Sequence, residues 1–194
     1  MAKGPRYRVA YRRRREGKTD YQARRVLATS ERPRFVVRPS NKNIVIQLVT
    51  SKVEGDYVLA QVNSKDLEGY GWLGGKKSTS AAYLLGLMAG KKAGKEGIEE
   101  ANLDLGLKRP TKGSKIFAAV KGAQDAGLYV PCDLDILPEV SKIEGKVLAD
   151  YAASIENPEE YKYMFSGYLK RGLRPQDLPE HFGSVKAKIE ANVQ

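Results

Sequence analysis

The sequence is poor in the residues that make disulfides and metal sites, with one cysteine and one histidine among its 194 residues. Cys132 has no partner within the chain, and together with His181 it cannot complete a tetrahedral site of sulfur and imidazole ligands. Long apolar runs are also missing: thirteen uncharged residues separate Lys77 from Lys91, whereas a membrane-spanning helix needs roughly twenty. No apolar stretch follows the cationic start at residues 1–6, so we expect no secretory signal. These absences predict a cytoplasmic protein without a membrane span.

Positive charge is in excess, and it is concentrated at one end of the chain. Residues 1–34 hold twelve Lys and Arg against three Asp and Glu, a net charge of +9 out of +11 for the whole chain. A near-neutral body with a basic arm is suited to attachment to a polyanion, because each neutralised phosphate releases condensed counterions. Tyr7 and Tyr11 stand among the arginines, and their rings can stack on unpaired bases. A targeting signal or a solvated tail is the alternative, but this mixture favours a nucleic acid as partner.

With 41% hydrophobic residues, the chain can bury one core, which at the usual ~100–200 residues per domain means one domain with appendages. Residues 1–18 are too charged to pack, so we predict an extended arm that is disordered unless a partner neutralises it. Thr19 is predicted to cap a short helix that ends near Ser30, with a glutamine three positions later completing a capping box. Arg24 and Arg25 of this helix are expected to point outward.

The body shows both strand and helix periodicity. Alternating patterns predict short strands at residues 34–38, 44–49, 57–62, 101–105 and 128–130. The first three follow one another through turns, which makes an antiparallel meander. Helical patterns predict two helices, one at 80–94 with Ser80 as its cap and one at 114–126. Strands followed by helix, strand, helix and strand imply an α/β fold with a mixed sheet covered by helices.

The last part of the chain has a different texture, with prolines between short helical patterns at residues 144–153, 159–170 and 182–191. From residue 139 onward, eight Lys and Arg are offset by nine Asp and Glu, so this part is less suited than the arm to bind RNA. The chain therefore divides into a basic RNA-binding arm with a short helix (1–34), an α/β body (35–132) and a helical C-terminal extension (133–194) that wraps the body.

A glycine-rich loop supplies the alternative function. Gly69–Gly74 matches the dinucleotide fingerprint G-x-G-x-x-G, which would make the protein a nucleotide-cofactor enzyme. Residues 64–68 separate the preceding strand from these glycines and the next helix starts only near Ser80, so the strand-turn-helix context of the motif is missing. The basic loop that follows fails the P-loop pattern. Whether Lys76 and Lys77 contact phosphates or lie in a solvated connection stays open.

Four ordered segments, at residues 12–21, 33–44, 81–87 and 117–128, closely resemble one family of ribosomal proteins. Over essentially its whole length the chain is similar to universal family eighteen of the large subunit, in its archaeal form, whose members bind 5S rRNA. The resemblance implies a three-layer body with a mixed sheet, no catalysis and no cofactor. It also implies attachment of 5S rRNA to the large subunit at its central protuberance, with contacts to 23S rRNA and to neighbouring large-subunit ribosomal proteins.

The candidate RNA-binding residues combine the basic arm and the loops of the body with the positions that match the family. They are Lys3, Arg6, Tyr7, Arg8, Tyr11, Arg12, Arg13, Arg14, Arg15, Lys18, Tyr21, Arg24, Arg25, Arg34, Arg38, Asn41, Lys42, Asn43, Lys76 and Lys77. We expect no catalytic residue, no metal ligand, no membrane contact and no homo-oligomer. A DNA-compacting protein with a basic tail is a further alternative, because charge alone does not separate RNA from DNA.

Overall fold

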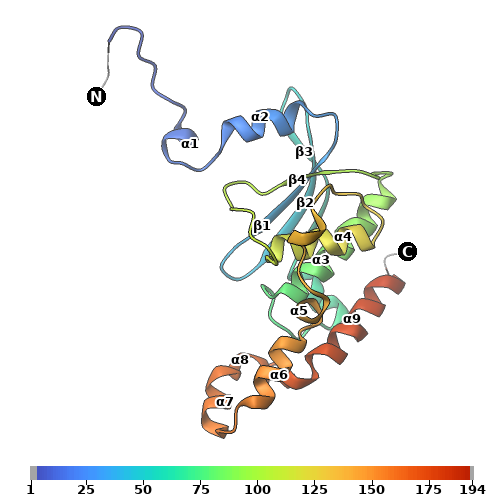
Figure 1. Ribbon diagram of the computed structural model, residues 1–194. Helices are drawn as coiled ribbons and strands as arrows, with labels where there is room; N and C mark the ends of the chain where they lie inside the picture. Colours follow the sequence, from blue (N-terminus) through green and yellow to red (C-terminus); the bar gives the residue numbers. More distant parts are fainter. Residues whose placement is uncertain (1–3, 193–194) are drawn as a thin grey trace.

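The computed structural model describes residues 4–192 as an α/β body with a basic segment at one end and a group of helices at the other (Figure 1). The strand order of its sheet is β3-β2-β1-β4. Strands β1 (Arg34–Pro39), β2 (Ile44–Ser51) and β3 (Asp56–Asn63) are antiparallel neighbours, and β4 (Asn102–Asp104) lies parallel to β1. The predicted meander, the mixed sheet and the α/β class are confirmed.

One face of the sheet forms the hydrophobic core. The antiparallel register pairs Phe35 with Leu48 and Val37 with Ile46, so these four side chains lie on the same face. All four are buried. They join the apolar side chains of two covering helices in a single core cluster.

Helices α3 (Thr79–Lys95) and α4 (Lys115–Asp125) supply that cover, and they pack closely against each other. A Cβ atom on Gly86 would lie 2.0 Å from the carbonyl oxygen of Ala119, and Gly122 makes a similarly close contact with the backbone of α3. Such distances leave no room for a side chain. The glycines therefore let the two helix backbones touch.

The cap of α3 is Ser78, not the predicted Ser80. The hydroxyl of Ser78 accepts a hydrogen bond from the backbone N–H of Ala81 at 3.0 Å. Ser80 is instead buried. Its Oγ atom faces Gly145 and lies 3.6 Å from where a Cβ atom on that glycine would be. Both serines satisfy the local preference for a cap, and packing against a segment distant in sequence decides between them.

The strand predicted at residues 128–130 is also wrong. This segment makes only a single parallel bridge, between Glu100 and Tyr129. Pro131 follows at once and has no N–H to continue a ladder. The sheet therefore ends at the short strand β4.

Residues 4–30 form the arm segment, which contains helices α1 (Arg12–Arg15) and α2 (Tyr21–Thr29). None of the residues from 4 to 30 is buried. The prediction of an extended arm up to residue 18 is wrong at α1, a single helical turn in which Arg12 Nε donates to the Glu16 carboxylate at 2.9 Å. The arm segment is therefore partly helical but packs little.

Helix α2 ends at Thr29, close to the predicted end, but its cap is Asp20 and not Thr19. The Asp20 carboxylate accepts hydrogen bonds from the N–H groups of Gln22 at 2.9 Å and Ala23 at 3.1 Å. A carboxylate also complements the positive end of the helix dipole. Thr19 Oγ1 accepts from the guanidinium of Arg13 at 2.8 Å instead.

The C-terminal part contains five helices within the described residues: α5 (Val140–Glu144), α6 (Lys146–Ser154), α7 (Pro158–Met164), α8 (Ser166–Leu169) and α9 (Leu178–Asn192). Between residues 4 and 192 the chain also forms three 3-10 turns: η1 (Asp66–Tyr70), η2 (Leu134–Ile136) and η3 (Pro175–Asp177).

These helices differ in their bounds from the predicted ones. The helix predicted at 144–153 is interrupted at Gly145, whose φ of 86° lies in the left-handed region. The helix predicted at 159–170 is divided into α7 and α8 at Phe165, which is buried. Helix α9 starts four residues before the predicted residue 182.

Helix α9 packs back onto the body. Phe182, Val185 and Ile189 are buried in the same core cluster as the sheet and α3, and the ring of Phe182 lies 5.7 Å from that of Tyr83. Helices α6, α7 and α8 project away from the sheet (Figure 1). Among residues 4–192, no helix combines the length and apolar character needed to cross a bilayer.

Candidate nucleic-acid interface

The arm segment displays its cations to solvent. Arg6, Arg8 and the four arginines of α1 are exposed, and so are Arg24 and Arg25 of α2. Glu16 binds both Arg12 and Lys18, at 2.9 and 2.7 Å. Hydrogen bonds from Lys18 and Arg12 hold the pKa of Glu16 below its usual value. One carboxylate thus meets two of the cations, which leaves a large positive surplus in this segment.

The aromatic residues of the arm segment are accessible as well. Tyr11 is 80% exposed and Tyr7 is 52% exposed, which leaves their rings free to stack on bases. Tyr11 lies near Tyr21, with 6.4 Å between ring centroids. Lys3, also predicted as an RNA contact, lies outside the described residues.

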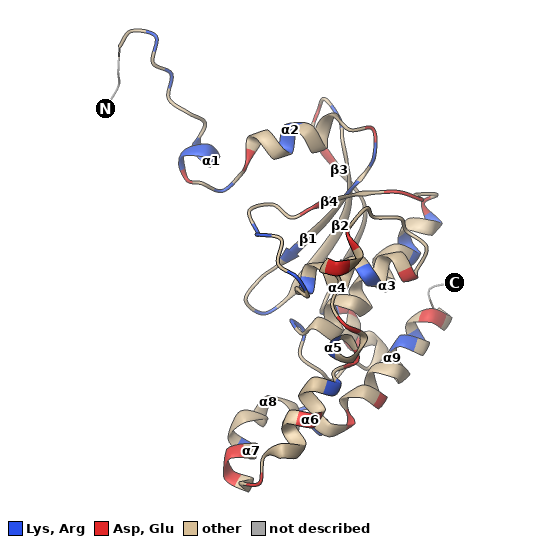
Figure 2. Cartoon of the chain, in the orientation of Figure 1, with Lys and Arg blue, Asp and Glu red and all other residues tan. Residues whose placement is uncertain are grey.

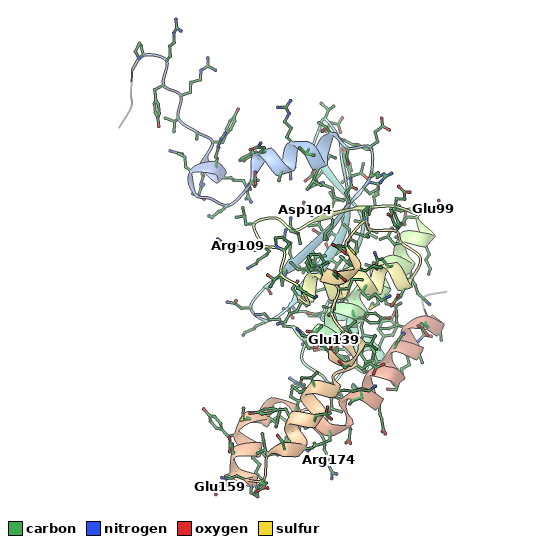
Figure 3. All side chains as sticks on the ribbon, in the orientation of Figure 1. Glu99, Asp104, Arg109, Glu139, Glu159 and Arg174 are labelled. Atoms are coloured by element: carbon green, nitrogen blue, oxygen red, sulfur yellow. The ribbon has the colours of Figure 1, made fainter. Side chains whose placement is uncertain are left out.

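Three of the predicted RNA-binding arginines form a charge network on the sheet face opposite the core. Arg24 of α2 and Arg34 of β1 both bind Asp56, each at 2.8 Å. Arg34 and Arg38 both bind Asp104, at 3.1 and 2.6 Å. Figure 3 shows Asp104 at the end of β4, near the base of the arm segment. The network joins α2 to the sheet and holds the arm segment where it leaves the body.

The three arginines of this network differ in how far their side chains are buried. The side chain of Arg34 is 4% exposed, whereas those of Arg24 and Arg38 are 42% and 43% exposed. Arg34 therefore has its guanidinium enclosed between carboxylates, and the other two retain a solvent-facing side. The sequence offered no signal for this difference, because Asp56 and Asp104 lie far along the chain from their partners.

The carboxylates of the network stay ionised. Burial acts to raise the pKa of Asp104, but the hydrogen bond and charge of Arg38, with the N–H of Gly106 and the charge of Arg34, outweigh burial and lower that pKa below its ordinary value. Asp56 behaves in the same way: burial is outweighed by Arg24 and Arg34, so its pKa is also lowered.

The loop between β1 and β2 divides its polar residues between two roles. Asn41 and Lys42 are exposed. Asn43 accepts a hydrogen bond from the hydroxyl of Ser64 at 3.2 Å, and that hydroxyl in turn accepts from the N–H of Ile44 at 3.1 Å. Asn43 therefore shapes the loop, while Asn41 and Lys42 face outward.

The basic loop before α3 is divided in a similar way. Lys76 forms an ion pair with Glu68. Lys77 lies with Lys115 and Lys142 in the wall of one cavity. Burial and the charges of Lys77 and Lys142 lower the pKa of Lys115. Lys115 and Lys142, with Lys108 and Arg109, were not among the predicted site residues. Residues 105–124 hold five Lys and Arg and no Asp or Glu, a signal that could have singled out Lys108, Arg109 and Lys115. Only the fold reveals that Lys77 and Lys142 join them.

The Gly69–Gly74 loop has a structural role in this fold. The turn η1 follows β3 and includes the first two residues of the loop, Gly69 and Tyr70. A Cβ atom on Gly74 would lie 2.3 Å from the ring of Trp72, so this position has no room for a side chain. The ring of Trp72 stacks on His181, at 5.2 Å between centroids, and the Nε2 atom of His181 accepts a hydrogen bond from the N–H of Leu73 at 3.0 Å. The loop is thus fastened to α9 and lacks the strand-turn-helix geometry of a dinucleotide site.

Lys and Arg lie along the arm segment and on the β1–β2 and β4–α4 loops, and further ones are spread over α3, α4 and α9 (Figure 2). Helix α7, at the projecting tip, carries Glu159 and Glu160 together with Lys162. The candidate interface therefore extends from the arm segment onto these loops of the body. Such a surface suits the backbone of a nucleic acid.

Comparison with known proteins identifies the family. The chain matches the family model described as "Ribosomal large subunit proteins 60S L5, and 50S L18" over residues 5–98 and 90–133. It is 50% identical over 196 residues to large ribosomal subunit protein uL18 of Thermofilum pendens, with all of both chains covered. It is likewise 50% identical over 193 residues to uL18 of Methanothermobacter thermautotrophicus, again over all of both chains. Identity to uL18 of Ignicoccus hospitalis is 52% over 192 residues, which cover 97% of this chain and 94% of that protein. The chain therefore belongs to the uL18 family of large ribosomal subunit proteins.

Proposed function

We propose that this protein binds 5S rRNA and attaches it to 23S rRNA at the central protuberance of the large ribosomal subunit. Its family consists of structural, non-enzymatic components of the cytoplasmic large subunit. The observation that carries the proposal is the arm segment, where exposed arginines extend from a folded body and no residue from 4 to 30 is buried.

The mechanism is electrostatic docking followed by ordering of the arm segment on RNA. The arginines Arg12–Arg15 occupy one helical turn, so their side chains radiate around its axis and can meet phosphates on more than one side. Each phosphate neutralised releases counterions, which supplies affinity that falls with salt. Tyr7 and Tyr11 add stacking, worth about 1–3 kcal/mol per base.

The extension is suited to protein neighbours. Tyr163 is 85% exposed and Met164 is 47% exposed at the end of α7, beside the exposed carboxylates Glu159 and Glu160. Large exposed apolar side chains are enriched where proteins meet, and a surface without an excess of cations offers little to the phosphates of RNA. The two ends of the molecule would then meet different partners.

Replacing Arg12–Arg15 by glutamine tests the proposal in the full-length chain. We expect weaker binding to 5S rRNA and a plot of log affinity against log salt that is flatter by about 0.7–0.9 units for each phosphate that the variant no longer neutralises. Filter binding over a salt series measures both quantities, with an unrelated RNA of equal length as the control for specificity. Deletion of residues 1–30 should abolish tight binding and remove the helical signal of α1 and α2, while the body keeps a cooperative thermal unfolding transition. Equal affinity of this truncated protein and the full chain at matched salt would refute the proposal.

A further inference from the structure

A second group of cations surrounds a pocket on the body, apart from the arm segment. The pocket has a volume of about 550 Å³ and lies between the β1–β2 loop, the β4–α4 loop, α5 and the first turns of α3 and α4. Five cationic side chains line it: Lys77, Lys108, Arg109, Lys115 and Lys142. We call it the basic pocket. Figure 3 shows Arg109 on the β4–α4 loop, on the side of the molecule that carries the β1–β2 loop.

The cations of the basic pocket lack counterions. Within residues 4–192, none of the five forms an ion pair with a carboxylate. Lys142 instead donates to the carbonyl oxygen of Gly113 at 3.0 Å, which holds the β4–α4 loop against α5. Like charges brought together in a partly buried site are destabilising unless an anion joins them. The pocket therefore has the charge of an anion site.

The polar groups at the start of α4 have the same character. Ser114 occupies the cap position, yet its hydroxyl forms no capping hydrogen bond. The Oγ atom is buried and has no hydrogen-bond partner among the described residues. A buried hydroxyl without a partner is costly, and an anion at this point would accept from it and from the free N–H groups of the helix's first turn.

The basic pocket is continuous with the surface of the arm segment. A second cavity, of about 600 Å³, lies between the arm segment and the β4 end of the sheet and is lined by Arg13, Lys18 and Arg24. The two cavities share Pro39 and Lys108 in their walls. A single chain of regularly spaced phosphates could therefore pass from one to the other.

We propose that the basic pocket binds backbone phosphates of the same RNA that the arm segment holds. The inference rests on the proposed function, and it adds a site on the body to the one on the arm segment. Ser114 and the first turn of α4 would receive a phosphate oxygen, and Lys115 and Lys142 would neutralise its charge.

The double variant Lys115→Gln, Lys142→Gln in the full-length chain tests this site. Its plot of log affinity against log salt for 5S rRNA should be flatter than that of the unsubstituted protein by about 0.7–0.9 units, the value for the one phosphate that is no longer neutralised. The control Lys162→Gln, Lys170→Gln removes the same charge from exposed positions of the extension and should keep the original slope. Thermal unfolding establishes that both variants are folded.

Lysine acetylation followed by mass spectrometry provides a readout on the unsubstituted protein. Lys108 and Lys142 are exposed in the free chain, and bound RNA should protect them while Lys162 stays reactive. Equal protection by inorganic phosphate at matched ionic strength would identify a free-anion site and overturn the assignment to RNA. If the protein binds 5S rRNA but shows neither protection nor a change of slope in the double variant, this inference is wrong and the proposed function stands. Failure of the unsubstituted protein to bind 5S rRNA would contradict the proposed function itself.

Discussion

The arm segment and the helix pair α3 and α4 differ in burial: the arm segment exposes charged side chains, whereas the two helices form much of the buried core. No residue from 4 to 30 is buried, whereas twelve of the seventeen residues of α3 are. Helices α3 and α4 stabilise the body because their glycines let the two backbones approach closely. The arm segment carries exposed arginines that are available to bind another molecule. Recognition and stability are therefore located in different parts of the chain, so substitutions can change one without the other.

One structure connects the two regions. The ion pairs among Arg24, Arg34, Asp56 and Asp104 run from α2 through β1 to β3 and β4. They lie on the sheet face opposite the core, so they attach the arm segment without burying it. Three substitutions, two of them with a matched control, separate these contributions.

The largest effect is expected from Gly86→Ala in α3. Its new methyl group would lie 2.0 Å from the carbonyl oxygen of Ala119, so α3 and α4 must move apart and pack less tightly. We expect the free energy of unfolding to fall by about 3 kcal/mol. Urea denaturation measures this change.

Gly94→Ala is the matched control for Gly86→Ala, because Gly94 is an exposed residue of the same helix with no atom within 4 Å of its Cβ position. This variant should gain about 0.5–1 kcal/mol from helix propensity. Similar effects of the two substitutions would show that the close approach of the helices does not determine stability.

Asp104→Asn removes the ion pairs of Asp104 with Arg34 and Arg38, which belong to the network between the arm segment and the sheet. Loss of the charge leaves Arg34 buried without its full counterion, and we expect a loss of about 2–3 kcal/mol at neutral pH. Because the pKa of Asp104 is lowered from 3.8 in the folded protein, its contribution is complete above that value and is lost as the pH falls through the folded pKa. Stability measured between pH 7 and pH 2 should therefore fall less steeply in the variant. An unchanged acid dependence would contradict the role of Asp104 in the network.

Asp20→Ala should have the smallest effect. It removes the cap of α2 and costs about 1 kcal/mol of local helix stability. Because α2 has no buried residue, hydrogen exchange in α2 should accelerate while the global unfolding transition stays unchanged. Thr19→Ala is the control and should leave the exchange of α2 amides nearly unaltered. A lowered global transition in Asp20→Ala would mean that the arm segment is part of the cooperative core.

Much of the fold could be predicted from local pattern. Phe35 and Val37 alternate with Arg34, Val36 and Arg38, and the apolar residues of α3 repeat at helical spacing, so these elements were predicted close to their true bounds. Errors arose where distant packing decides between local options. Ser80 is as good a cap as Ser78 in sequence, but it is buried. Gly145 interrupts a helical pattern at a point where the chain packs against Leu178. A Cβ atom on Gly145 would lie 2.6 Å from the Leu178 side chain.

The candidate site was predictable to the extent that it depends on composition. Twelve cations in the first 34 residues mark the arm whatever its conformation. The sequence gives no sign that Arg34 is enclosed by Asp56 and Asp104, or that Lys115 and Lys142 share a pocket with Lys77, because each of these groups is brought together by the sheet and the helices.

By itself, the sequence determined where the charge is concentrated, which segments alternate as strands or helices, and which family the chain resembles. These are properties of residues and of their near neighbours. Only the tertiary structure decided which cations face solvent, which are neutralised by a carboxylate, and which are gathered without a counterion. The physical reason is that the availability of a charge depends on the groups around it in space, and most of those groups are far away along the chain.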